Sequence, residues 1–158
     1  MTIRRASQND IPALSELLLQ VCNVHHDGRP DLFKPDGTKY TPAQLEEMIP
    51  DDNRPIFVAE TEGGVKGYAF CLFKHHPDDT CVTDIRTLYI DDLCVDEHCR
   101  GQGIGRQLYE FVLQFAKKSG CYNVTLNVWC CNPSAIQFYE NCGLVPQKIG
   151  MEKIIQED

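Results

Sequence analysis

A glycine-rich segment between two strongly patterned apolar segments constrains the fold more than any other feature of the sequence. Residues 87–95 form a β-branched and apolar run typical of a strand, and residues 100–105 read Arg-Gly-Gln-Gly-Ile-Gly. From Leu108 onward, apolar residues recur at intervals of three and four, which predicts an amphipathic helix ending near Gly120. A strand, a glycine turn and a helix in this order create a helix N-terminus with unpaired backbone N–H groups, which binds anions.

The rest of the chain alternates between strand and helix patterns. Ahead of the glycine-rich segment, the patterns predict two helices over 8–22 and 41–49, an irregular loop over 23–40, and strands over 2–5, 54–60 and 65–75. After it, they predict a helix over 132–141 and strands over 122–129 and 149–155, with Trp129 in the core. This order predicts one mixed α/β domain over residues 1–158, with no repeat and no internal linker.

Composition narrows the class of partner. The 158 residues include 15 basic and 23 acidic side chains, and the net charge of −8 disfavours nucleic acid and favours encounter with a cationic amine. The sequence shows no membrane span and no signal peptide, so we expect a cytoplasmic protein. The nine cysteines form no Cys-x-x-Cys pair, so we expect no metal site, and we expect most of these thiols to be buried and reduced.

Two motifs carry a family resemblance. Residues 95–105, Val-Asp-Glu-His-Cys-Arg-Gly-Gln-Gly-Ile-Gly, resemble the acetyl-CoA signature of the GNAT superfamily, in which Arg/Gln-x-x-Gly-x-Gly/Ala follows a strand and opens a helix. Residues 132–144 resemble the family's Asn-x-x-Ala-x-x-Phe-Tyr-x-x-x-Gly-Phe segment, with Leu144 in place of the final aromatic residue. The resemblance covers nearly the whole chain. It implies an acetyl-CoA-dependent N-acetyltransferase whose central mixed, mostly antiparallel sheet is flanked by helices.

The same resemblance implies a set of site residues. The strand backbone at Leu93, Cys94 and Val95 would pair with the pantetheine arm of acetyl-CoA, and Asn127 and Asn132 would contact that arm. Tyr139 would point at the sulfur. The pyrophosphate would lie on the segment Arg100, Gly101, Gln102, Gly103, Ile104 and Gly105, with Arg106 adding a charged contact.

Acid–base requirements suggest the catalytic groups. A primary amine with a lysine-like pKa of about 10.4 must lose a proton before it attacks a thioester. Asp91 and Asp92 are the candidate bases, with Asp91 slightly favoured and a water relay as the alternative. Strand alternation predicts that the two side chains face opposite sides of the sheet. Tyr139 is the candidate donor to the departing thiolate.

The acceptor stays open at this point. A small cationic amine is favoured by the acidic surface, and a protein N-terminal or lysine acetyltransferase would need a groove between residues 23–40 and 146–150. A non-catalytic acetyl-CoA-binding module is the alternative from a different class. A homodimer is also left open, and no membrane or nucleic-acid partner is expected.

Overall fold

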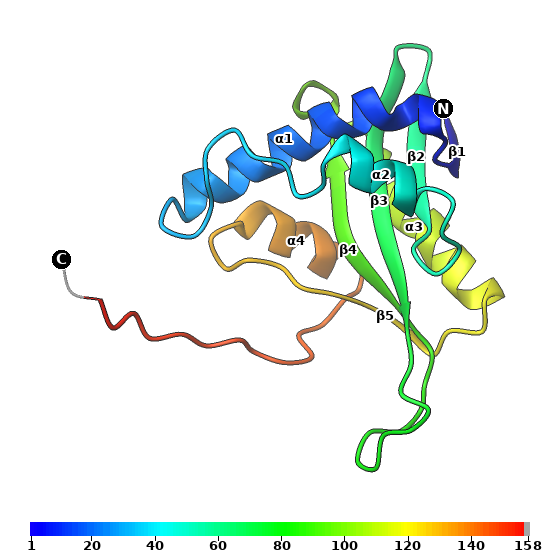
Figure 1. The fold of residues 1–158 in the computed structure, drawn as a ribbon, viewed down its shortest axis with the longest axis vertical. Helices are drawn as coiled ribbons and strands as arrows, with labels where there is room; N and C mark the ends of the chain where they lie inside the picture. Colours follow the sequence, from blue (N-terminus) through cyan, green and yellow to red (C-terminus); the bar gives the residue numbers. More distant parts are fainter. Residues whose placement is uncertain (157–158) are drawn as a thin grey trace.

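The computed structural model describes residues 1–156 and is built on a five-stranded sheet in the order β1-β2-β3-β4-β5 (Figure 1). β1 to β4 are antiparallel neighbours, and β5 joins the far side of β4 in parallel. The predicted mixed, mostly antiparallel sheet is therefore confirmed. The strands are β1 (Thr2–Arg5), β2 (Ile56–Thr61), β3 (Gly64–Lys74), β4 (Thr87–Val95) and β5 (Asn123–Leu126).

Helices cover both faces of this sheet and create two cores. One core joins the leucines of α1 to the sheet residues Tyr68, Phe70 and Cys94. The other joins α3 to residues such as Leu88 and Ile90 on the opposite face. In Figure 1, α1 and α2 lie in front of the sheet and α3 lies behind it. The helices are η1 (Gln8–Asp10), α1 (Ile11–Gly28), α2 (Pro42–Met48), η2 (Glu97–Cys99), α3 (Ile104–Lys118) and α4 (Pro133–Asn141).

Gly67 on β3 sets how closely α3 approaches the sheet. A Cβ atom at this position would lie 2.9 Å from the Cys94 carbonyl oxygen and 2.9 Å from Leu108 Cδ1. Both distances are shorter than real Cβ contacts, so only glycine lets α3 pack here without displacement. The start of α3, which carries the glycine-rich segment, is thereby held against the strands that form the site.

Several predicted boundaries are wrong. α1 continues to Gly28, six residues into the predicted 23–40 loop, because His25 and His26 contact Phe33 of the following segment. β5 ends at Leu126, so Trp129 lies outside the core with 43% of its surface exposed. No strand forms over 149–155, since this segment has no neighbouring strand within the described residues.

The expectation for the cysteines is also wrong in its main part. All nine thiols are free, but only Cys71 and Cys94 are buried, while Cys81 and Cys130 are exposed. The remaining five are partly buried, because they lie on helices, at helix ends or in loops rather than on the inward faces of the sheet. Burial raises the pKa of the Cys71 and Cys94 thiols to about 12, which keeps them protonated.

Candidate active site

The site begins where β4 and β5 separate. β5 pairs with β4 only from Thr87 to Ile90, whereas β4 continues to Val95. From Asp91 to Val95, the backbone edge of β4 that faces away from β3 therefore has no strand partner among residues 1–156. Such an edge presents free N–H and C=O groups, which a ligand containing amides can pair with as a strand would.

The glycine-rich loop lies directly after this open edge. Gly101 and Gly103 adopt φ angles of 77° and 80°, in the left-handed region that glycine occupies without strain. Within the described residues, the backbone N–H groups of 101–106 donate to no protein acceptor. No heavy atom lies within 4 Å of the place where a Cβ of Gly101 would stand. The loop therefore offers a row of free donors with open space beside it, as phosphate oxygens require.

The two arginines near this loop behave differently. Arg100 Nε lies 3.4 Å from the Val95 carbonyl oxygen, and its side chain is exposed beside the free N–H groups. Arg106 instead donates to the Asn141 carbonyl oxygen at 2.9 Å and lies 3.6 Å from Glu110. Arg106 thus ties α3 to the last turn of α4, and its contact with phosphate stays a prediction.

Close packing of α3 against α4 positions Tyr139. A Cβ at Gly105 would lie 3.4 Å from the Phe138 ring and from a Val95 methyl group, so α4 approaches closely at this point. The Phe138 and Tyr139 rings meet edge to face with centroids 5.1 Å apart. Burial, followed by the charge of Asp92, raises the pKa of Tyr139 well above its usual 10. The phenol therefore stays protonated at neutral pH and can donate a hydrogen bond.

Asp91 and Asp92 face the same side of the sheet, which corrects the prediction from strand alternation. On β3, Phe70 pairs with Asp92 and Cys71 pairs with Ile90, so Asp91 is the extra residue of a β-bulge. Ile90 belongs to the core beneath α3. Asp91 and Asp92 instead accept hydrogen bonds from two tyrosine hydroxyls on the side of the core beneath α1. The bulge therefore brings two carboxylates together at the point where β4 loses β5.

Two tyrosines and a lysine, none of them predicted from the sequence, hold these carboxylates. The Tyr68 hydroxyl donates to Asp92 Oδ2 at 2.8 Å, and the Tyr40 hydroxyl donates to Asp91. Lys39 Nζ lies 2.9 Å from Asp91 Oδ1. The Tyr40 and Phe70 rings stack at 5.5 Å, which fixes Tyr40 over the sheet. Finding these partners requires the register of β3 against β4 for Tyr68 and the course of the loop before α2 for Lys39 and Tyr40, and no local pattern of residues encodes either.

The two carboxylates differ in their surroundings. Burial raises the pKa of Asp92 to about 6, although the Tyr68 hydrogen bond and the charge of Lys39 oppose the rise. The neighbouring charge of Asp91 adds to it. Asp91 is paired directly with a lysine, whereas Asp92 has no paired cation within the described residues. Asp92 is thus a carboxylate that can gain and lose a proton close to neutral pH.

The two predicted asparagines have structural partners. Asn127 Nδ2 donates to the Tyr89 hydroxyl at 3.2 Å. The Asn132 side-chain oxygen accepts from the Ala135 N–H at 3.2 Å and from the Ser134 hydroxyl at 3.0 Å, so Asn132 is the N-cap of α4. Both side chains lie in the segment that follows β5, and their contact with a cofactor arm stays a prediction.

Aromatic side chains border the site on the side of the 29–41 loop. The Phe33 ring lies 4.9 Å from His25 of α1 and 5.2 Å from Trp129, which joins the end of α1 to the segment after β5. The same loop carries Lys39 and Tyr40 to Asp91. The loop therefore forms part of the candidate site through the contacts of Lys39 and Tyr40 with Asp91.

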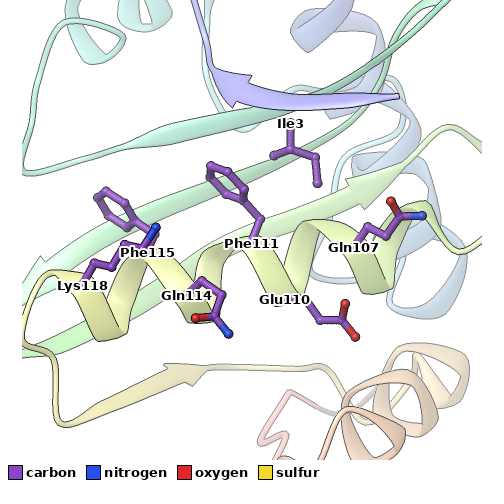
Figure 2. Close-up of a pocket in the computed structure, with 7 residues that line it drawn as sticks. All are labelled: Ile3, Gln107, Glu110, Phe111, Gln114, Phe115 and Lys118. Carbon is purple, nitrogen blue, oxygen red and sulfur yellow. The ribbon is translucent and has the colours of Figure 1, made fainter.

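The hollow in Figure 2 lies elsewhere. It is formed by Ile3 of β1 and one side of α3, including Phe111 and Phe115. None of the predicted site residues lines it, and its polar members, Gln107, Glu110, Gln114 and Lys118, are exposed residues of α3. We therefore place the candidate site at the β4 edge.

An open strand edge beside a helix N-terminus with free amides is the arrangement expected of an acyltransferase that uses a coenzyme A thioester. The Acetyltransferase (GNAT) family matches residues 20–144, and the chain belongs to this family of transferases. The family uses acetyl-CoA as its acetyl donor. The predicted resemblance and the enzyme class are confirmed.

Some curated relatives match only part of the chain, and others match nearly all of it. A glucosamine 6-phosphate N-acetyltransferase of Arabidopsis thaliana is 37% identical over 65 residues, which is 41% of this chain and 42% of that protein. Two rice relatives match to a similar extent, so the chain spans about two fifths of the length of these plant proteins. An uncharacterised N-acetyltransferase of Methanocaldococcus jannaschii is 26% identical over 94% of this chain and 62% of its own length.

Solved structures match over the whole described fold. The crystal structure of a variant Bacillus halodurans protein has a TM-score of 0.94 at 29% identity and covers 99% of this chain and 100% of that one. The Arabidopsis thaliana glucosamine-6-phosphate N-acetyltransferase structure has a TM-score of 0.70 at 25% identity, covering 98% of each chain. No helix of the described residues is both long and apolar enough to span a membrane.

Proposed function

We propose that this protein transfers the acetyl group of acetyl-CoA to a small cationic amine, by direct attack of the amine within a ternary complex. The observation that carries the proposal is the bulge that brings Asp91 and Asp92 to one face of β4, beside its open edge. A pair of carboxylates attracts a protonated amine, and one of them can then accept its proton.

The donor fits the residues of the open edge and the glycine-rich loop. The free N–H groups of residues 101–106 would hold the pyrophosphate, and the unpaired edge of β4 at Leu93, Cys94 and Val95 would pair with the amides of the pantetheine arm. A backbone N–H of Cys94 or Val95 would also donate to the oxyanion of the tetrahedral intermediate. Acetyl-CoA supplies an activated acetyl thioester at this place.

Asp92 is the base that the geometry favours. Its pKa of about 6 makes its carboxylate a stronger proton acceptor than an ordinary aspartate, yet it is mostly ionised at neutral pH. Asp91 is engaged by Lys39 and Tyr40, so it orients and attracts the ammonium group instead. Asp92 takes one proton from the ammonium group, and the free amine nitrogen then bonds to the acetyl carbon. The nitrogen loses its second proton to solvent, and the carbon–sulfur bond breaks.

Tyr139 acts on the leaving sulfur. A thiol has a pKa of about 8.5, well below that of a buried phenol, so the thiolate does not take the proton completely from Tyr139. The phenol contributes a hydrogen bond that stabilises the developing negative charge. Its contribution to the rate is therefore moderate, and the final proton on the thiol comes from solvent.

The site itself gives two reasons for a cationic acceptor. Lys39 Nζ already lies 2.9 Å from Asp91 Oδ1, so this carboxylate accepts a primary ammonium group in the structure. An acceptor with a phosphate group would meet two carboxylates and a chain with a net charge of −8. The aromatic residues Phe33 and Trp129 add an apolar surface for a short alkyl or ring body.

An acceptor panel tests the proposal. Diamines and polyamines, amino sugars with and without phosphate, and lysine peptides would be incubated with acetyl-CoA, and acetylated products would be measured by mass spectrometry. We expect the highest kcat/KM for small multivalent cations. Preference for a phosphorylated amino sugar or a peptide would refute the acceptor class. Binding of acetyl-CoA without any product would refute catalysis and identify a binding module.

A further inference from the structure

A lysine of the protein itself occupies the place that an acceptor amine needs. Lys39 Nζ lies 2.9 Å from Asp91 Oδ1 and donates to the Asp91 backbone oxygen at 3.2 Å. Burial raises the pKa of Asp92, and the charge of Lys39 opposes this rise, so the ammonium group acts on both carboxylates. The primary ammonium group of Lys39 therefore stands beside the proposed base.

The position of Lys39 along β4 puts it close to the proposed thioester. Asp91 is the first residue of β4 after its last pair with β5, which joins Ile90 to Leu126. The acetyl thioester would lie against residues 93–95 of the same open edge, and the two residues from 91 to 93 span roughly 7 Å of strand. The Lys39 side chain is 46% exposed, and its flexible four-carbon stem can swing through this distance.

The residue that follows Lys39 anchors its backbone at the site. The Tyr40 hydroxyl donates to Asp91, and the Tyr40 ring stacks on Phe70 at 5.5 Å. Lys39 Nζ lies 5.7 Å from the centre of the Tyr40 ring, so both side chains turn toward β4. An amine anchored in this way meets a bound thioester within one molecule, which raises its effective concentration by orders of magnitude.

Lys39 also competes with an added acceptor for Asp91. Lys39 lies on the Oδ1 atom of this carboxylate and Tyr40 lies on its Oδ2 atom. A small cationic amine must therefore displace the Lys39 ammonium group before it reaches Asp91. Acetylation would remove the positive charge of Lys39 and, with it, the ion pair. Modified Lys39 would leave Asp91 Oδ1 open to the acceptor.

We propose that the site acetylates its own Lys39, by intramolecular transfer from bound acetyl-CoA, and that this frees Asp91 for a small amine. The inference rests on the proposed function, because it uses the same donor and the same base. One proton of the Lys39 ammonium group passes to Asp92, and the free amine nitrogen bonds to the acetyl carbon. The nitrogen loses a second proton to solvent, the carbon–sulfur bond breaks, and the thiolate takes a proton from solvent. The products are acetylated Lys39 and coenzyme A.

Mass spectrometry tests the transfer. The wild-type protein would be incubated with acetyl-CoA and no added amine, and acetyl groups would be located by peptide mapping at successive times. Lys34 is the internal control, because it is an exposed lysine of the same loop that spontaneous acetylation reaches as readily. We expect Lys39 to react at least roughly tenfold faster than Lys34, with a rate constant that does not change with protein concentration. Gly103→Val, which should not bind acetyl-CoA, should reduce Lys39 to the rate of Lys34.

A parallel incubation with putrescine separates this inference from the proposed function. Acetylated putrescine with unmodified Lys39 would overturn the inference and leave the proposed function standing, whereas no acetylation of either would refute both. Equal rates at Lys39 and Lys34, or a wild-type rate at Lys39 in Gly103→Val, would mean spontaneous chemistry and would overturn the inference. So would a rate constant that grows with protein concentration, because one molecule would then modify another. An acetyl group on Lys39 of the wild type as isolated, absent from Gly103→Val, would support it.

Discussion

Replacing Asp92 by Asn should stabilise the fold at neutral pH while slowing the reaction. A pKa that rises from 3.8 to about 6 on folding means that ionised Asp92 costs the folded protein about 3 kcal/mol at pH 7. Asn removes this cost and can still accept the Tyr68 hydrogen bond, but its amide N–H groups need partners, which costs about 1 kcal/mol. We expect a net gain of about 2 kcal/mol in the free energy of unfolding near pH 7.5.

The sign of the pH dependence makes this prediction specific. Because the folded pKa is the higher one, the folded protein binds the proton more tightly, and the wild type loses stability as pH rises from about 4 through 6. At about pH 5 protonation relieves roughly half of the cost of ionised Asp92. The gain of Asp92→Asn in the free energy of unfolding should therefore fall below about 1 kcal/mol at this pH. Urea unfolding of both proteins across this pH range measures the difference.

The matched control is Asp91→Asn, which removes the carboxylate paired with Lys39 and should not stabilise the protein at any pH. A destabilised Asp92→Asn protein near pH 7.5, or a gain that does not change with pH, would refute the assignment of a raised pKa to Asp92. Stabilisation by removal of a charged group would be consistent with an active-site residue that is retained at the expense of fold stability.

Three further perturbations test other parts of the site. Gly103→Val places a β-branched residue at a φ of 80° and should abolish the rise in melting temperature on adding acetyl-CoA, with an unchanged circular dichroism spectrum; an undiminished shift would place the cofactor elsewhere. Tyr139→Phe keeps the ring packing and should lower kcat by roughly ten- to a thousandfold with little change in acetyl-CoA affinity; equal rates at all pH values would remove this hydroxyl from the mechanism. Gly67→Ala should lower the free energy of unfolding by about 1–3 kcal/mol, because its Cβ would press against the Cys94 carbonyl oxygen and Leu108. The control Gly63→Ala meets only ordinary contacts and should change the free energy of unfolding little. Equal stability of the two variants would show that α3 does not pack as described.

The sequence predicted those parts of the molecule whose determinants are local. The glycine-rich segment and the helix that follows it could be predicted from residue spacing and from glycine positions. The mixed, mostly antiparallel sheet flanked by helices followed from the resemblance to the family. These predictions succeeded because apolar periodicity and glycine conformations act over a few residues.

The parts that failed depend on contacts between distant segments. The bulge at Asp91 arises from the register of β4 against β3, and it reversed the expected orientation of one carboxylate. Tyr40 and Tyr68 became partners of the carboxylates only through tertiary packing, since they stand 51 and 24 residues away from them in sequence. Trp129 lies outside the core because β5 ends three residues before it. The end of β5 is determined by its pairing in the sheet and not by the local apolar pattern.

The pH profile of acetyl transfer tests the central claim most directly. The rate is best followed by loss of the thioester absorbance, because exposed thiols such as those of Cys81 and Cys130 would react with thiol reagents. The kcat/KM of the wild type should rise with pH through a limb near pH 6, and this limb should lie at the same pH for two acceptor amines of different pKa. The Asp92→Asn protein should lack that limb. A limb that moves with the pKa of the amine, or that persists unchanged in Asp92→Asn, would contradict the assignment of Asp92 as the base.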